Sequence, residues 1–120
     1  MVFKVRLYSY STCTTCRKAI KWLDDHDIRY DLFDIVKDPP SREMLIKALN
    51  LFDNRKKLLN TSGISYRELG AKVVNLMSDS ELLDALVKDG KLIKRPFLIV
   101  NTETILVGFK VDEWIEKLVK

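Results

Sequence analysis

The segment YSYSTCTTCRKAIKWL, residues 8–23, contains both cysteines of this 120-residue chain, Cys13 and Cys16. Just before them, FKVRLYSY (residues 3–10) alternates apolar and charged side chains, which is typical of a half-buried strand. From Thr14 onward, apolar residues recur at the spacing of a helix. The cysteine pair is therefore predicted to lie where the first strand ends and the first helix begins.

The rest of the chain continues to alternate between strand and helix patterns. The expected elements are the helix at 14–26, a strand within 28–36, a helix at 41–51, short helical pieces within 54–77, a helix at 78–90, strands at 96–100 and 104–109, and a final helix at 110–120. Their order is β-α-β, a helical stretch, then β-β-α. This order predicts the α/β class and a thioredoxin-like fold with a mixed four-stranded sheet. We expect one domain, residues 1–120, with a helical insertion at about 41–90.

The charge of the chain is mildly basic, with a formal net charge of +4. Basic residues gather in NRKK (54–57) and in KDGKLIKRP (88–96), and neither cluster has interleaved aromatic residues. Such clusters are typical of an ordinary solvated surface, with some attraction for small anions. We therefore expect no direct binding of nucleic acid.

The apolar runs are all shorter than the roughly 20 residues that cross a bilayer. Lys4 and Arg6 interrupt the short apolar run at the N-terminus, so no secretory pattern is recognised there. We therefore expect a cytoplasmic protein that does not act in a membrane. In a reducing cytoplasm a permanent structural disulfide is disfavoured.

The position of the cysteine pair has chemical consequences. Unpaired N–H groups and the positive end of the dipole at a helix N-terminus favour an anion such as a thiolate. Arg17 and Lys18 add positive charge within reach of Cys13. Because a thiolate is the nucleophilic form of cysteine, Cys13 is predicted to attack and Cys16, one turn further into the helix, to resolve the adduct by closing a disulfide.

Other interpretations of the pair are a metal site and two inert buried cysteines. A structural zinc site usually has four ligands, whereas the chain offers two cysteines and His26, about three turns away on the same helix. We therefore expect no metal. Inert cysteines stay possible from the sequence, although the junction of strand and helix beside Arg17 favours a redox-active pair.

Two further segments contain candidate site residues. In KRPFLIV, Pro96 precedes a strand and is the candidate cis-proline, and Arg95 is expected to point its guanidinium toward Cys13. The alternative is a surface arginine beside a proline that opens an edge strand. In LLNTSG, Asn60 either belongs to a polar loop lining the thiol pocket or precedes a turn that ends a helix, with Gly63 at positive φ.

Five motifs, spread over nearly the whole chain, support a family resemblance: STCTTCRKA, DPPSREML, LLNTSGISYRELG, LLDALVKDGKLIKRP and VGFKVDEW. On these motifs the chain resembles the ArsC-type arsenate reductases and the Spx-type redox regulators. The resemblance implies a thioredoxin-like fold with a helical insertion, an attacking cysteine at Cys13 and an anion-coordinating arginine at Arg95.

Two features of the pattern distinguish this chain within the resemblance. Cys16 is shared with the Spx-type members. Of the three arginines that surround the oxyanion in glutaredoxin-linked arsenate reductases, only Arg95 matches, because Asn60 stands at the middle position and Gly108 or Phe109 at the late one.

The resemblance implies two functions. The first is a thiol–disulfide oxidoreductase with a small anionic or thiol substrate and no bound cofactor, reduced by glutathione with glutaredoxin or by thioredoxin. The second is a redox-sensing transcriptional regulator in which a disulfide between Cys13 and Cys16 changes binding to RNA polymerase.

Overall fold

The computed structural model describes residues 4–119, which form two compact units, residues 4–34 with 95–119, and Ile35–Lys94. Residues 3 and 120, included in the predictions for the first strand and the last helix, lie outside the described residues. That both units belong to one domain stays a prediction.

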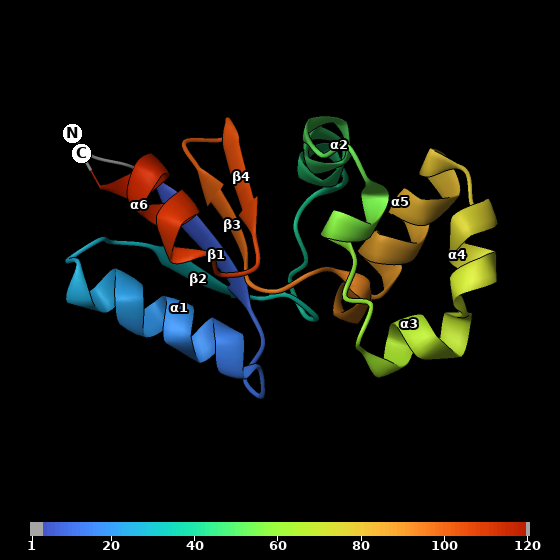
Figure 1. Ribbon diagram of the computed structural model, residues 1–120, viewed down its shortest axis with the longest axis horizontal. Coiled ribbons are helices and arrows are strands. Elements are labelled where there is room, and N and C mark those ends of the chain that lie inside the picture. The colour runs from blue at the N-terminus through green and yellow to red at the C-terminus, as the bar shows by residue number, and fades with distance from the viewer. Residues whose placement is uncertain (1–3, 120) are drawn as a thin grey trace. The chain divides into compact units, whose positions relative to one another are not determined.

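The first unit is built on a four-stranded sheet (Figure 1). Its strands are β1 (Val5–Ser9), β2 (Asp31–Asp34), β3 (Phe97–Val100) and β4 (Thr104–Val107), in the order β2-β1-β3-β4. β1 runs parallel to β2 and antiparallel to β3, and β3 and β4 form an antiparallel hairpin. The predicted α/β class, mixed sheet and thioredoxin-like order of elements are therefore confirmed.

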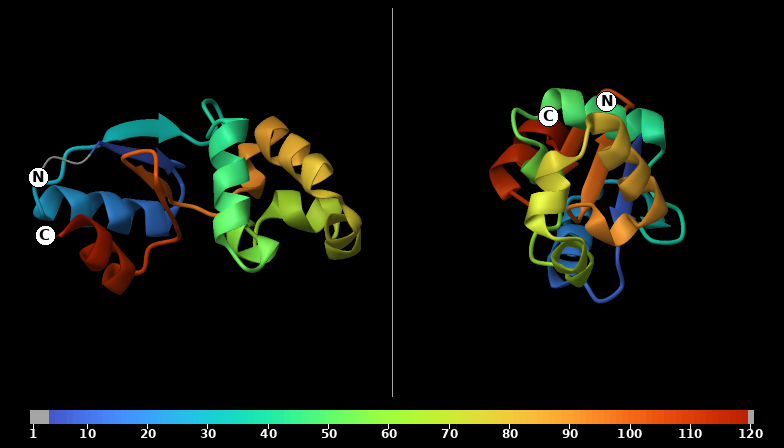
Figure 2. Two further views of the ribbon diagram at one scale, coloured as in Figure 1. Left: turned by 90° about the horizontal axis from the view of Figure 1, so that it is seen from above. Right: turned by 90° about the vertical axis from the view of Figure 1, so that its right-hand side faces the viewer.

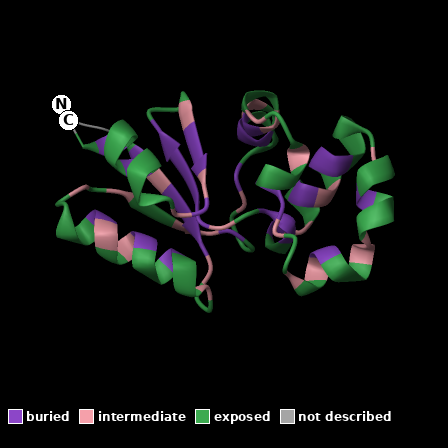
Figure 3. Ribbon diagram, viewed as in Figure 1, coloured by how far each residue is buried: buried purple, intermediate pink, exposed green. Residues whose placement is uncertain are grey.

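Two helices, α1 (Thr14–Asp25) and α6 (Val111–Leu118), pack on the same side of this sheet (Figure 2). The apolar faces that the helical spacing predicted meet the inward side chains of the strands. The buried residues of this core are Val5, Leu7, Ala19, Leu23, Leu98, Val100, Leu106, Trp114 and Leu118. Figure 3 shows the burial along β1 and β3, and every residue of β3 is buried. The inner strands are thus a rigid base for the loops at their ends.

The second unit is helical. It contains α2 (Arg42–Leu51), a 3₁₀ turn (Arg55–Leu58), α3 (Ile64–Leu69), α4 (Ala71–Leu76), α5 (Asp79–Lys88) and a second 3₁₀ turn (Gly90–Leu92). Ser41 caps α2 by accepting from the N–H of Met44 at 3.2 Å. Ser78 and Glu81 form a reciprocal capping box at the start of α5. Both helices begin where the sequence predicted, because helix caps depend on residues that are close together in the chain.

Backbone contacts connect distant parts of the second unit. The N–H of Asn60 donates to the carbonyl of Leu92 at 2.8 Å, and the N–H of Lys94 donates to the carbonyl of Leu58, also at 2.8 Å. Gly90 packs tightly against residue 35, since a Cβ on this glycine would lie 1.9 Å from the carbonyl oxygen of Ile35. A side chain at position 90 therefore has no room.

Candidate functional site

The two cysteines lie at the junction of β1 and α1, as the sequence predicted. After β1 the chain turns, and the N–H of Cys13 donates to the carbonyl of Tyr10 at 3.0 Å. Cys13 is the N-cap of α1, where its sulfur accepts a hydrogen bond from the N–H of Cys16 at 3.2 Å. A sulfur therefore occupies the position that a serine or aspartate oxygen usually takes. Negative charge on this sulfur is stabilised by the donor and by the helix dipole.

The two thiols have different surroundings. Cys13 is partly exposed, whereas Cys16 has no solvent-accessible surface, and both are free cysteines. Burial, together with a hydrogen bond to Cys13, raises the pKa of the Cys16 thiol to about 11, although the Tyr10 backbone and the Ser9 side chain oppose the shift. Of the two cysteines, only Cys13 has surface in contact with solvent. Cys16 is protonated at neutral pH and lies next to the sulfur with which it would pair.

Arg17 forms a hydrogen bond within the cysteine loop, and its predicted effect on Cys13 stays a prediction. Its guanidinium donates to the carbonyl of Ser11 at 2.8 Å, within the turn that leads to Cys13. The side chain thus connects the first turn of α1 to the loop before it. Lys18, the other basic residue of the motif, is exposed.

Arg95 and Pro96 lie at the start of β3. The peptide bond between them is cis, as the sequence predicted for Pro96. Because β3 lies between β1 and β4, the alternative of an edge strand is wrong. The guanidinium of Arg95 is half-buried and lies over the ring of Tyr10, with Cζ 5.1 Å from the ring centroid.

Two residues near the thiols were missed by the sequence reasoning. Ser9 is buried, and it forms a hydrogen bond with the Cys16 thiol. Tyr10 contacts Arg95 through its ring and Cys13 through its carbonyl. Their position, at the end of the first strand and directly before the cysteine motif, is the signal that could have identified them.

Asn60 belongs to the second unit. Its backbone N–H bonds to Leu92, and its carbonyl accepts from the N–H of Gly63 at 3.2 Å. Gly63 has φ of −84° and precedes α3, so the expected positive φ is wrong. Lack of space for a side chain explains the glycine at position 63, because a Cβ there would lie 2.5 Å from the side-chain nitrogen of Asn60. A substrate-binding role for Asn60 stays a prediction.

Within residues 4–119, no group of three or more histidine, cysteine, aspartate or glutamate residues is placed to hold a metal ion. His26 caps the C-terminal end of α1, and its ring stacks on that of Trp22 with the centroids 4.1 Å apart. In the same described part of the chain, no helix is long and apolar enough to cross a membrane.

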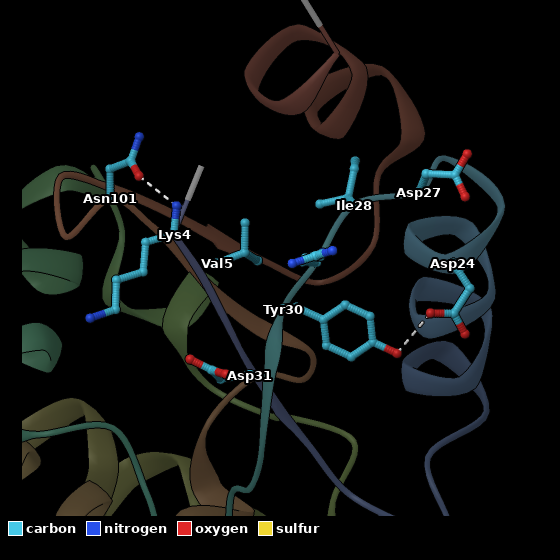
Figure 4. Close-up of a pocket in the computed structure, with 9 residues that line it drawn as sticks. Lys4, Val5, Asp24, Asp27, Ile28, Tyr30, Asp31 and Asn101 are labelled. Carbon is cyan, nitrogen blue, oxygen red and sulfur yellow. Dashed lines mark hydrogen bonds between the residues drawn. The ribbon is translucent and has the colours of Figure 1, made fainter. Parts of the chain in front are cut away.

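A separate hollow opens at the other end of β1 (Figure 4). It is lined by Lys4 and Val5 at the start of the strand, and by residues around Tyr30, whose hydroxyl donates to Asp24 at 3.0 Å. Cys13 follows the opposite end of β1, and none of the predicted site residues lines this hollow. The hollow is therefore distinct from the thiol site.

Comparisons with known proteins agree with the fold and the cysteine site. The model of the ArsC family matches residues 8–117. The chain is 46% identical over 112 residues to the uncharacterized protein YusI of Bacillus subtilis strain 168, covering 91% of this chain and 93% of that protein. It is 34% identical over 110 residues to the global transcriptional regulator Spx of Streptococcus mutans, covering 91% and 79%.

A solved structure is similar over almost its whole length. The crystal structure of an ArsC family related protein from Bacteroides fragilis has a TM-score of 0.84 and 39% sequence identity, covering 94% of this chain and 96% of that one. The family match over most of the chain, the similar sequences and this shared architecture together show that the chain belongs to the ArsC family.

Proposed function

We propose that this protein is a cytoplasmic thiol–disulfide oxidoreductase in which Cys13 attacks and Cys16 resolves. The observation that supports this most strongly is the asymmetry of the pair. The sulfur of the partly exposed Cys13 accepts the N–H of Cys16 at 3.2 Å, while Cys16 itself is fully buried. An exposed nucleophile and a protected partner are the arrangement that ordered disulfide exchange requires.

The reaction proceeds in two displacements. The Cys13 thiolate attacks one sulfur of a disulfide, the S–S bond breaks, and one substrate thiolate leaves. Cys16 then loses its proton and attacks the Cys13 sulfur of the mixed disulfide, which releases the second substrate thiolate. The protein is oxidised by two electrons and the substrate is reduced to two thiols. Glutathione with glutaredoxin, or thioredoxin, reverses the oxidation.

The substrate class is a small anionic or thiol compound. Arg95 is the proposed anion-binding residue, with Pro96 beside the substrate and Arg17 supporting the cysteine loop. Arsenate is one anion to test. Its reduction to arsenite would take up the same two electrons from Cys13 and Cys16.

A second candidate is a redox-sensing transcriptional regulator. The 34% identity to the regulator Spx of Streptococcus mutans favours it. In this role the disulfide between Cys13 and Cys16 is a switch, and its formation changes binding to RNA polymerase. The same chemistry serves both functions, because a fold does not by itself determine the function of a site.

The test is intact-mass analysis of the reduced protein after separate exposure to arsenate, dilute hydrogen peroxide and glutathione disulfide, with reduced glutathione present in the arsenate sample. Loss of two hydrogens with glutathione disulfide, or a glutathione adduct on Cys13, supports the oxidoreductase. Oxidation that depends on arsenate identifies a reductase of that anion.

Two other results would count against the proposal. Oxidation by peroxide alone favours the regulator, and binding to purified RNA polymerase in the reduced and oxidised states then tests it. A protein that stays reduced with every oxidant contradicts both functions.

A further inference from the structure

The register of the sheet brings two side chains together beside the thiols. β1 and β3 pair antiparallel, with Tyr8 opposite Phe97 as the last pair toward the cysteine loop. Tyr10 and Arg95 each lie two residues beyond this last pair. Their side chains are in contact, with Cζ of Arg95 5.1 Å from the centroid of the Tyr10 ring. This distance is within the range of a cation–π interaction.

The guanidinium of Arg95 contacts the face of the Tyr10 ring. A cation–π contact draws the charge to the face of a ring and does not consume the five N–H donors of the guanidinium. A half-buried arginine held in this way can still donate hydrogen bonds to an anion. The planar arrangement of those donors matches a carboxylate.

Tyr10 also belongs to the loop that carries the nucleophile. Its carbonyl accepts the N–H of Cys13 at 3.0 Å, and its backbone forms a hydrogen bond with the Cys16 thiol. The ring and the backbone of one residue therefore connect Arg95 to both cysteines. Loss of the Tyr10 ring therefore removes a contact that holds the guanidinium next to the loop that carries the nucleophile.

We propose that Tyr10 is a positioning residue, whose ring holds Arg95 where it binds the carboxylate of a small anionic disulfide attacked by Cys13. This inference rests on the proposed oxidoreductase function. In the step concerned, the Cys13 thiolate attacks the disulfide and expels a carboxylate-bearing thiolate. Arg95 neutralises the carboxylate charge and exchanges no proton or electron.

The experiment compares two probes of similar size, dithiodipropionate, which carries carboxylates, and hydroxyethyl disulfide, which is neutral. The rate constant of Cys13 with each probe is measured by rapid quenching and intact-mass analysis, and the anionic-to-neutral ratio is calculated. We expect Tyr10→Leu to lower this ratio by about threefold or more, the loss that a partly desolvated cation–π contact predicts. Tyr10→Phe keeps the ring and restores the ratio.

Control variants separate positioning from a general loosening of the loop. Both probes are slowed equally by a distorted loop, so their ratio reports on charge recognition alone, and Tyr10→Val serves as a second variant without a ring. Tyr30→Leu removes a half-buried tyrosine from the same unit and leaves the ratio unchanged. In an Arg95→Ala background, Tyr10→Leu has no further effect.

Three results would contradict the proposal. An unchanged ratio in both Tyr10→Leu and Tyr10→Val overturns the role of Tyr10 and leaves the oxidoreductase function standing. If Tyr10→Leu lowers the anionic-to-neutral ratio by the same factor in the Arg95→Ala background as in the wild type, Tyr10 acts through another group. A wild-type protein that reacts with neither disulfide overturns the proposed function and this inference together.

Discussion

The backbone N–H of Cys16 donates to the sulfur of Cys13 at 3.2 Å, while the sulfur of Cys16 is shielded from solvent. Residues 13–16 thus form the N-terminal turn of α1 and also contain the reactive cysteine pair. One sulfur acts as the helix cap and is accessible, and the other is part of the buried face. This asymmetry lets the two thiols have different roles although they are close in sequence.

The division of roles predicts different products from two single variants. With glutathione disulfide, Cys13→Ser is expected to lose all thiol exchange, because the remaining sulfur is buried. Cys16→Ser is expected to accumulate a glutathione adduct on Cys13, since no thiol is left to displace it. Intact-mass analysis over a time course distinguishes the two.

As a control, the melting temperatures of the variants show whether they still fold. Serine is a preferred N-cap, so Cys13→Ser should keep its melting temperature, whereas Cys13→Ala should lose about 1 kcal/mol of stability. Equal reactivity of the two serine variants would show that the assignment of attacking and resolving thiols is wrong.

The contact between Arg17 and Ser11 predicts a role in holding the cysteine loop. Arg17→Ala removes the hydrogen bond to the Ser11 carbonyl and should slow the reaction of Cys13 with neutral hydroxyethyl disulfide about two- to tenfold, as the loss of one such bond allows. Lys18→Ala, which removes a neighbouring exposed charge, is the matched control. If both variants slowed the reaction equally, charge rather than loop geometry would explain the effect.

The buried thiol predicts a pH dependence of stability. Burial raises the pKa of Cys16 to about 11, whereas an unfolded cysteine titrates near pH ~8.5. Between these values the unfolded chain releases a proton that the folded chain keeps. The free energy of unfolding of the reduced protein should therefore be unaffected below this window and fall by about 1–2 kcal/mol between pH 8 and pH 10.

Urea unfolding of the reduced protein and of Cys16→Ala across this pH range measures the effect. All other titrating groups are present in both proteins. The difference between their free energies of unfolding therefore reports on Cys16. A difference that stays constant from pH 8 to pH 10 would contradict the prediction.

The close approach of Gly90 to Ile35 predicts a steric cost in the second unit. Gly90→Ala places a Cβ against a backbone carbonyl that cannot rotate away, and should destabilise the protein by about 1–3 kcal/mol. Gly63→Ala meets the side-chain nitrogen of Asn60, which can move, so its cost should be smaller. Thermal unfolding of both variants tests this order. A larger loss of stability in Gly63→Ala than in Gly90→Ala would show that the steric interpretation is wrong.

Much of the fold could be predicted because its signals are local. The alternation before the cysteines, the helical spacing after Thr14 and the serine caps at Ser41 and Ser78 act over a few residues each. The exact ends of the elements also depend on contacts between distant residues. The strand expected within 28–36 spans only Asp31–Asp34, because pairing with β1 determines where a strand ends.

The chain order alone was enough to place Cys13 and Cys16 at a strand–helix junction and to single out Pro96. Only the tertiary structure decided that Cys16 is fully buried, that Arg17 bonds to Ser11, and that Tyr10 lies against Arg95. Tyr10 and Arg95 are far apart in the sequence, and the register between β1 and β3 brings them together. Local spacing encodes which face of a strand or helix a side chain occupies, whereas its neighbours depend on how distant elements pair and pack.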